Sequence, residues 1–155
     1  MPGTIYIGKA GHIAVMAEFS YRGYNVAMPE IDKGDDVFVV NDTTGAMWRV
    51  QVKTARQQQQ RNSARYQFRI RETAIATPQT PELHFVFVMR KDKGWRFFVI
   101  ARDVLRNYTR QNPPLGTPSG DFRQIVVTLH NDNRLTGSRI DLSHHLEDWM
   151  AWAEI

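Results

Sequence analysis

Apolar and polar residues alternate over much of the chain with the two-residue period that is typical of β-strands. Six runs rich in β-branched and aromatic residues are predicted to be strands, at residues 36–40, 47–53, 64–71, 83–89, 95–100 and 124–129. Residues 24–28 form a further extended segment that ends at Pro29. The turn at residues 91–94 is expected to join two of the strands as a hairpin.

Helical spacing of apolar residues appears in three other segments, at residues 8–22, 102–110 and about 143–154. One face of the first helix is predicted to hold Ile7, Gly11, Ala14, Glu18 and Tyr21. The small residues on this face would let the helix lie close to a sheet. Gly23 is expected to end the helix as its C′ residue.

The order of these elements predicts a mixed α/β fold with a central mixed β-sheet flanked by helices. Two polar segments are predicted to be loops: residues 57–63, which are rich in glutamine, and residues 112–120, which contain three prolines. A length of 155 residues fits a single domain over residues 1–155, with enough chain to bury a core.

The composition narrows the chemistry that the chain can perform. It has no cysteine, which excludes disulfides, a thiolate nucleophile and a zinc–thiolate site. No apolar run approaches the roughly 20 residues of a membrane-spanning helix, and no secretory signal is recognisable. We therefore expect a soluble, cytoplasmic protein without a membrane partner.

Charge is unevenly distributed, although the formal net charge is only +4. Residues 1–48 hold three Lys or Arg and six Asp or Glu. Residues 49–71 hold no acidic residue and seven basic ones: Arg49, Lys53, Arg56, Arg61, Arg65, Arg69 and Arg71. An acidic segment followed by a basic one suits a protein that holds a metal ion beside a polyanion, while a solvated basic strand and loop is the alternative.

The predicted hairpin of residues 36–53 carries the candidate chemistry. If its turn is centred on residues 41–46, Asp36 lies opposite Gln51, and Lys53 shares the face of Gln51. Asp35 then falls on the other face. Carboxylate and amide oxygens are suitable ligands for Mg²⁺ or Mn²⁺, and a nearby lysine can stabilise charge that develops on a phosphate. The alternative is the exposed polar face of an ordinary hairpin.

These residues resemble the PD-(D/E)XK nuclease superfamily, and most closely its small prokaryotic branch whose third motif reads Gln-x-Lys. The similarity is good over residues 8–55 and weaker as far as Trp149. It rests on Gly11, Arg22-Gly23-Tyr24-Asn25-Val26, Pro29, Asp32-Lys33-Gly34-Asp35-Asp36 and Gln51-Val52-Lys53-Thr54. The resemblance implies a restriction-endonuclease-like fold, a divalent metal and DNA cleavage.

Residue roles follow from the resemblance position by position. Asp36 would be the metal-binding acid, Gln51 the second metal ligand and Lys53 the catalytic lysine. Position 51 departs from the commoner Glu or Asp, which removes one charge. Relatives often carry a glutamate in the first helix at the position that is His12 in this chain. The helical wheel instead favours Glu18 as the acidic residue of this helix.

The strand at residues 63–71 alternates between arginine or glutamine and apolar residues. Arg65, Arg69 and Arg71 share one face, and together with Arg56 they are the predicted nucleic-acid contacts, because the planar guanidinium can bond two phosphate oxygens. The alternative is a solvated sheet face.

The function expected from the sequence is therefore that of a metal-dependent endodeoxyribonuclease. It would use Mg²⁺ or Mn²⁺ and no small-molecule cofactor, and it would act on DNA, with a homodimer needed for a double-strand cut. One alternative is a catalytically inactive nuclease-fold module that binds nucleic acid or a protein partner. A third hypothesis is an unrelated α/β domain whose hairpin face is merely polar.

Overall fold

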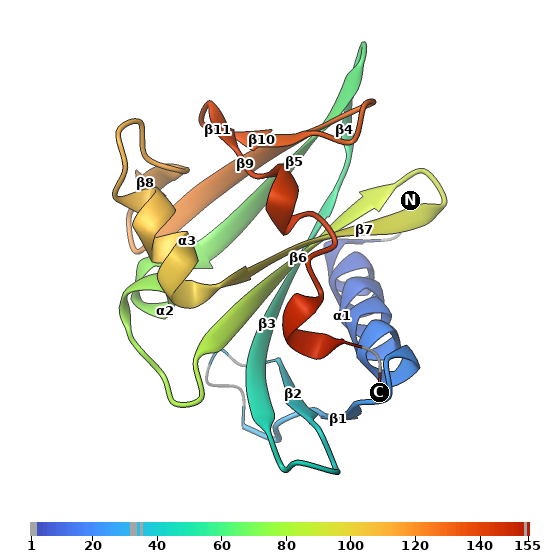
Figure 1. The fold of residues 1–155 in the computed structure, drawn as a ribbon. Helices are drawn as coiled ribbons and strands as arrows, with labels where there is room; N and C mark the ends of the chain where they lie inside the picture. Colours follow the sequence, from blue (N-terminus) through green and yellow to red (C-terminus); the bar gives the residue numbers. More distant parts are fainter. Residues whose placement is uncertain (1–2, 32–33, 35, 154) are drawn as a thin grey trace.

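The computed structural model describes residues 3–31, 34, 36–153 and 155, which form two β-sheets packed against each other and one long helix (Figure 1). The central sheet is mixed. Its strands, in spatial order, are β1 (Asn25–Ala27), β2 (Val37–Val40), β3 (Met47–Arg56), β6 (Leu83–Lys91) and β7 (Gly94–Ala101). Neighbours are antiparallel except for β3 and β6, which are parallel.

The second sheet, here called the outer sheet, is antiparallel. Its order is β11 (Ile140–Asp141), β10 (Leu135–Gly137), β9 (Phe122–His130), β5 (Ser63–Arg71) and β4 (Gln58–Gln60), and β8 (Thr117–Ser119) pairs with β9. The chain passes from the central sheet to the outer sheet between β3 and β4. It returns through the short helix α2 (Glu72–Ala76), which leads to β6.

The central sheet is buried on both faces because its strands alternate between two apolar layers. Val50 on β3 and Val86 on β6 belong to the layer that includes Val15 and Phe19 of α1 (Thr4–Tyr21). Phe85, Phe87 and Met89 of β6 belong to the other layer, which includes Tyr66, Phe68, Ile70, Ile125 and Val127 of the outer sheet. Helix α3 (Arg102–Thr109) adds Leu105 to that layer.

The predicted central mixed sheet and its flanking helix are confirmed, and each predicted strand is present with small shifts at its ends. Two predicted loops were wrong in part. Residues 58–60 pair with β5, and residues 117–119 pair with β9. Neither segment has alternating apolar side chains, and their strand conformation comes from backbone pairing with a neighbouring strand.

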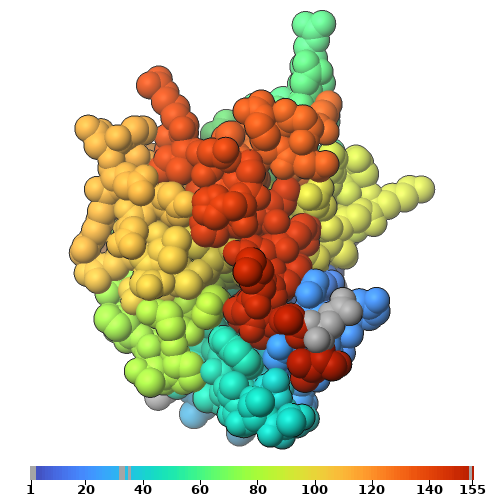
Figure 2. Space-filling view, viewed as in Figure 1, coloured from blue at the N-terminus to red at the C-terminus, as the bar shows by residue number. Residues whose placement is uncertain are grey.

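The prediction of a C-terminal helix over residues 143–154 was wrong; Glu154 itself lies outside the described residues. The segment forms two 3₁₀ turns, at Ser143–His145 and Met150–Trp152. Between them the backbone of Glu147 is left-handed (φ 55°), its N–H donates to the Phe97 carbonyl, and its carboxylate accepts the Phe97 N–H. Pairing with β7 therefore replaces helical bonding, and Figure 2 shows this segment as a band across one face of the molecule.

The first helix is confirmed, and Gly23 (φ 93°) follows it as predicted. Its buried face is rotated from the predicted one, with Gly11, Val15 and Phe19 fully covered and Tyr21 exposed. Packing of Val15 and Phe19 on the valine layer decided the rotation. Within the described residues, no helix has the length and apolarity to cross a membrane.

Close approach of α1 to β3 depends on Gly11. A Cβ at this position would overlap the Thr54 side chain, lying 2.7 Å from its Cγ2. We expect Gly11→Ala to lower the free energy of unfolding by about 1–3 kcal/mol through overpacking, as measured by urea denaturation. Gly8→Ala is the matched control, since nothing lies within 4 Å of its Cβ, and should stabilise the protein by about 0.5–1 kcal/mol. Equal effects of the two substitutions would contradict this account.

His145 is buried, and its Nε2 lies 3.1 Å from the Tyr108 hydroxyl. Burial, with a smaller contribution from His144, lowers the pKa of His145 to about 4. The unfolded chain therefore binds this proton below about pH 6.5, before the folded protein does, so stability is lost as the pH falls from 6.5 toward 4. Urea denaturation at pH 7 and pH 5 should show an extra loss of about 2 kcal/mol in the wild type relative to His145→Gln. The same pH dependence in both proteins would refute the assignment.

Candidate active site

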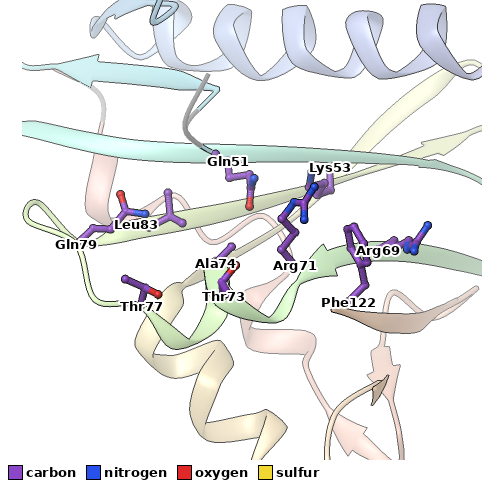
Figure 3. A pocket seen from close by; sticks show the side chains of 11 residues that line it. Gln51, Lys53, Arg69, Arg71, Thr73, Ala74, Thr77, Gln79, Leu83 and Phe122 are labelled. Carbon is purple, nitrogen blue, oxygen red and sulfur yellow. The ribbon is translucent and has the colours of Figure 1, made fainter. Parts of the chain in front are cut away.

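A pocket of about 530 Å³ lies where β3 of the central sheet faces the end of β5 in the outer sheet (Figure 3). Helix α2 closes one side of it. The described lining consists of Gly34, Gln51, Lys53, Arg69, Arg71, Thr73, Ala74, Thr77, Gln79, Leu83 and Phe122. Three of these side chains carry a positive charge and none carries a negative one.

Alternation along β3 places Gln51 and Lys53 in this pocket. Val50 and Val52 point toward α1, so the residues between and after them point to the opposite side of the sheet. Gln51 is only 7% exposed, and its Oε1 atom is buried without a hydrogen-bond partner among the described residues. Burying an amide oxygen without a hydrogen bond costs free energy. Such an atom is typical of a position where a ligand binds.

Asp36 directly precedes β2 and lies beside Gln51. The predicted hairpin register is confirmed, since Val37 pairs with Val50 and Val40 with Met47. Asp36 donates its N–H to the Val50 carbonyl over 2.8 Å, and its Oδ2 accepts the Val52 N–H over 2.6 Å. The carboxylate is therefore held at the end of β2, next to the strand that carries Gln51 and Lys53. Asp35 lies outside the described residues.

The helix contributes His12 to this region and directs Glu18 elsewhere. His12 Nε2 lies 3.0 Å from the Asp36 carbonyl oxygen and donates to it. Glu18 lies six residues, or about 9 Å, farther along the helix than His12. Its carboxylate forms an ion pair with Arg22 at 2.8 Å. The structure thus brings position 12, and not position 18, to Asp36.

The four arginines predicted to contact nucleic acid are distributed over three places. Arg69 and Arg71 project into the pocket, where their guanidinium carbons lie 3.9 Å and 4.9 Å from the centre of the Phe122 ring. Arg65 is on the same face of β5 but lines a separate groove. Arg56 lies near the start of α1, beside Thr4 and Ile7.

The protein oxygen atoms at this site can bind a divalent metal ion only if substrate phosphates and waters complete its coordination. Within the described part of the chain, no three His, Cys, Asp or Glu side chains are grouped to hold a metal ion. Asp36 and the buried oxygen of Gln51 are the residues that could hold Mg²⁺, which commonly binds through one or two protein ligands, waters and substrate phosphates.

Three features of the pocket were not predicted from the sequence. Helix α2 supplies Thr73 and is followed by Thr77, and its five residues are too few for a periodic signal. Phe122 was outside the predicted strand, yet it packs under both arginines. The contact of His12 with Asp36 joins residues 24 positions apart and had no local signal.

No family profile and no curated protein matches the sequence. Among solved structures, the bacterial homing endonuclease I-Ssp6803I matches with a TM-score of 0.64 over 97% of this chain and 91% of that chain, at 20% identity. The two proteins share a fold. The mixed sheet and its helices therefore have the arrangement of a nuclease-like fold.

The buried Gln51 amide should lower stability in the absence of a ligand. We expect Gln51→Leu to raise the free energy of unfolding by about 1 kcal/mol in EDTA, because it removes an unsatisfied buried oxygen at nearly constant volume. Urea denaturation measures the change. Gln67→Leu, at an exposed position of β5, is the control and should stay within about 0.5 kcal/mol of the wild type. Clear destabilisation by Gln51→Leu would show that the oxygen has a partner in the protein.

Proposed function

We propose that this protein is a metal-dependent endonuclease that hydrolyses phosphodiester bonds of DNA, and that it belongs to the branch of the PD-(D/E)XK superfamily with a Gln-x-Lys motif. One observation carries the proposal: Lys53 and the buried Gln51 amide share a pocket with Arg69 and Arg71, directly beside Asp36. The similarity in fold to a protein described as a homing endonuclease supports it.

Asp36 and Gln51 would hold Mg²⁺ or Mn²⁺. When bound, such an ion supplies Lewis-acid polarisation of the scissile phosphate. The Val52 N–H bond to Asp36 Oδ2 orients the carboxylate, and the His12 bond to the Asp36 carbonyl holds the backbone at the same residue. The metal-binding acid is thus positioned from two directions.

Lys53 would act on the substrate and on water. Its ammonium group lies in the same pocket, two residues from Gln51 on the same face of β3, and can donate hydrogen bonds to the attacking water and to the phosphate. Hydrolysis adds water across the bond, so that one P–O bond forms and another breaks while the leaving oxygen takes a proton.

Arg69 and Arg71 would bind the sugar–phosphate backbone next to the cut. Stacking on Phe122 holds both guanidinium groups at one side of the pocket. Each can bond two phosphate oxygens, so they neutralise charge that Lys53 alone would leave uncompensated. Arg65, farther along the same face, and Arg56 would extend this contact.

A catalytically inactive nuclease-fold module is the second candidate. Gln51 stands where the commoner motif has a carboxylate, and the described residues hold no cluster of three His, Asp or Glu ligands. A protein of this kind would bind nucleic acid through the same arginines without cleaving it.

A homodimer in the cytoplasm is part of the proposal. The chain supplies one Gln-x-Lys motif, on β3, and a double-strand cut needs two such sites. No small-molecule cofactor enters the proposed reaction.

Cleavage of supercoiled plasmid with Mg²⁺ or Mn²⁺ tests the proposal. Lys53→Met should lower the cleavage rate by about 10²–10³, because it removes one charged donor from the developing phosphate charge. Lys93→Met, on the exposed turn between β6 and β7, should cleave like the wild type. Circular dichroism establishes that both variants are folded.

Two results would overturn this function. Equal cleavage by the wild type and Lys53→Met would assign the activity to a contaminant or to another site. Salt-dependent DNA binding without any cleavage by the wild type would favour the inactive module.

A further inference from the structure

The exposed face of the outer sheet continues outward from the proposed active site. Eight positions on β5 and β9 point to this face: Arg65, Gln67, Arg69, Arg71, Phe122, Gln124, Val126 and Thr128. None carries a carboxylate. The Gln67 and Gln124 amides make no side-chain hydrogen bond within the described part of the chain, so their donors and acceptors are available to a ligand.

Part of this face forms a groove of about 390 Å³. Gln124, Val126 and Thr128 of β9 form its floor, and Arg65 of β5 lies along one side. The opposite side consists of residues 116–117 and 138–139, where the Gly116 N–H donates to the Ser138 hydroxyl over 3.1 Å. Arg139 gives this wall a positive charge as well.

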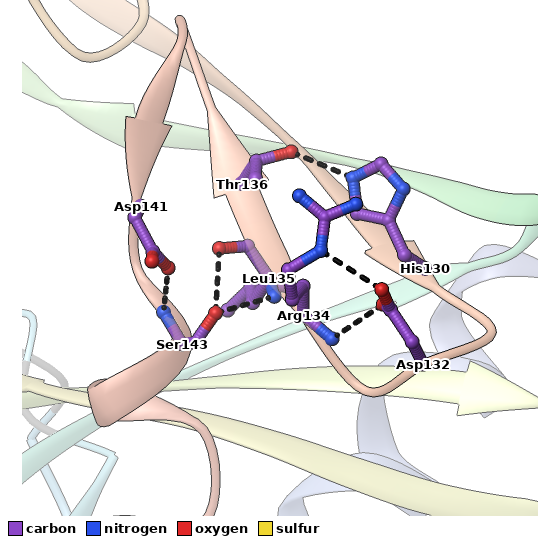
Figure 4. Close-up of polar contacts among 7 residues, drawn as sticks. All are labelled: His130, Asp132, Arg134, Leu135, Thr136, Asp141 and Ser143. Atoms are coloured by element: carbon purple, nitrogen blue, oxygen red, sulfur yellow. Dashed lines mark hydrogen bonds and ion pairs between the residues drawn. The ribbon is translucent and has the colours of Figure 1, made fainter.

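Thr136 and Gly137 of β10 also line the groove, next to residues 138–139, and polar contacts hold this strand in place (Figure 4). Thr136 Oγ1 lies 3.0 Å from His130 Nε2, and the Ser143 hydroxyl accepts the Leu135 N–H at 3.0 Å. The Asp141 carboxylate accepts the Ser143 N–H at 2.9 Å. These bonds tie β9, β10 and the segment after β11 together, so the groove is preformed.

The groove and the active-site pocket are connected through shared residues. Arg69 lines the active-site pocket and also a smaller cavity of about 260 Å³ that contains Gln67 and Gln124. Gln124 in turn lines the groove. A ligand that is cut beside Lys53 can therefore extend along β5 and β9 without leaving the protein surface.

Duplex DNA matches this surface in charge, size and chemistry. The face has arginines and no carboxylate, which suits a polyanion. The β5–β9 ladder has nine residue pairs, about 30 Å, which is close to the roughly 34 Å of one turn of duplex DNA. Side chains can reach base edges in the DNA major groove, which is about 12 Å wide, but not in the deep, narrow major groove of an RNA duplex. Glutamine can bond both N6 and N7 of adenine.

We infer that the outer face of β5 and β9 lies against the major groove of duplex DNA and that the Gln67 and Gln124 side chains read base edges there. This inference rests on the proposed function in that the DNA cut in the active-site pocket is the DNA that is read. Arg69 and Arg71 bind backbone beside the cut, and the two glutamines determine which sequence is placed there.

A randomised duplex library tests the inference with two readouts on the full chain. Cleaved duplexes are sequenced after reaction with Mg²⁺, and bound duplexes are sequenced after selection in EDTA. The wild type should prefer particular bases near the cut. Gln124→Ala and Gln67→Ala should each reduce the preference at one or two positions about tenfold, while retaining non-specific binding. Gln111→Ala, an exposed glutamine after α3, is the control and should reproduce the wild-type profile.

The outcomes separate this inference from the proposed function. A wild-type preference that neither glutamine variant changes, or no preference at all, would overturn the reading role. Equal binding of an RNA duplex would overturn the major-groove docking. Altered preferences among bound duplexes together with no cleavage would refute hydrolysis and leave the reading surface standing.

Discussion

The arrangement depends on one constraint, the strict alternation of side chains along β3 in a sheet that is covered on both faces. Val50 and Val52 complete the valine layer under α1. The residue between them and the residue after them must then point into the space between the two sheets. That space is filled by aromatic residues on β6, but beside Gln51 and Lys53 it is left as the pocket. The valine layer that stabilises the fold thereby also positions the candidate chemistry.

Hydrogen bonds and one close approach bring β2 and α1 to this strand, in addition to the burial of apolar side chains. Asp36 directly precedes β2, and its N–H and carboxylate both bond β3. Gly11 lets α1 approach Thr54 closely, and the same helix brings His12 to the Asp36 carbonyl. The carboxylate beside the pocket is consequently part of the hydrogen-bonded framework, which limits its movement during any reaction.

The two faces of the outer sheet differ in character, since one is apolar and buried and the other carries positive charge. Tyr66, Phe68 and Ile70 are buried against the central sheet, and the intervening arginines and glutamine are exposed. The arginines lie close together without acidic partners in the pocket, and a buried amide oxygen there has no partner among the described residues. Such departures from ordinary surface and core design are typical of a site selected for binding.

The sequence alone determined what depends on neighbours along the chain. The register of the β2–β3 hairpin, the two faces of β5 and the end of α1 at Gly23 follow from alternation, turn position and glycine, all of which are local. Tertiary structure decided the rest. It determined which face of α1 is buried, and it brought His12 and not Glu18 to Asp36. It placed Phe122 under Arg69 and Arg71. Pairing of Glu147 with Phe97 replaced the expected C-terminal helix. Each of these contacts joins residues far apart in the chain, so its free energy is absent from any local pattern and arises only when the elements that carry those residues come together.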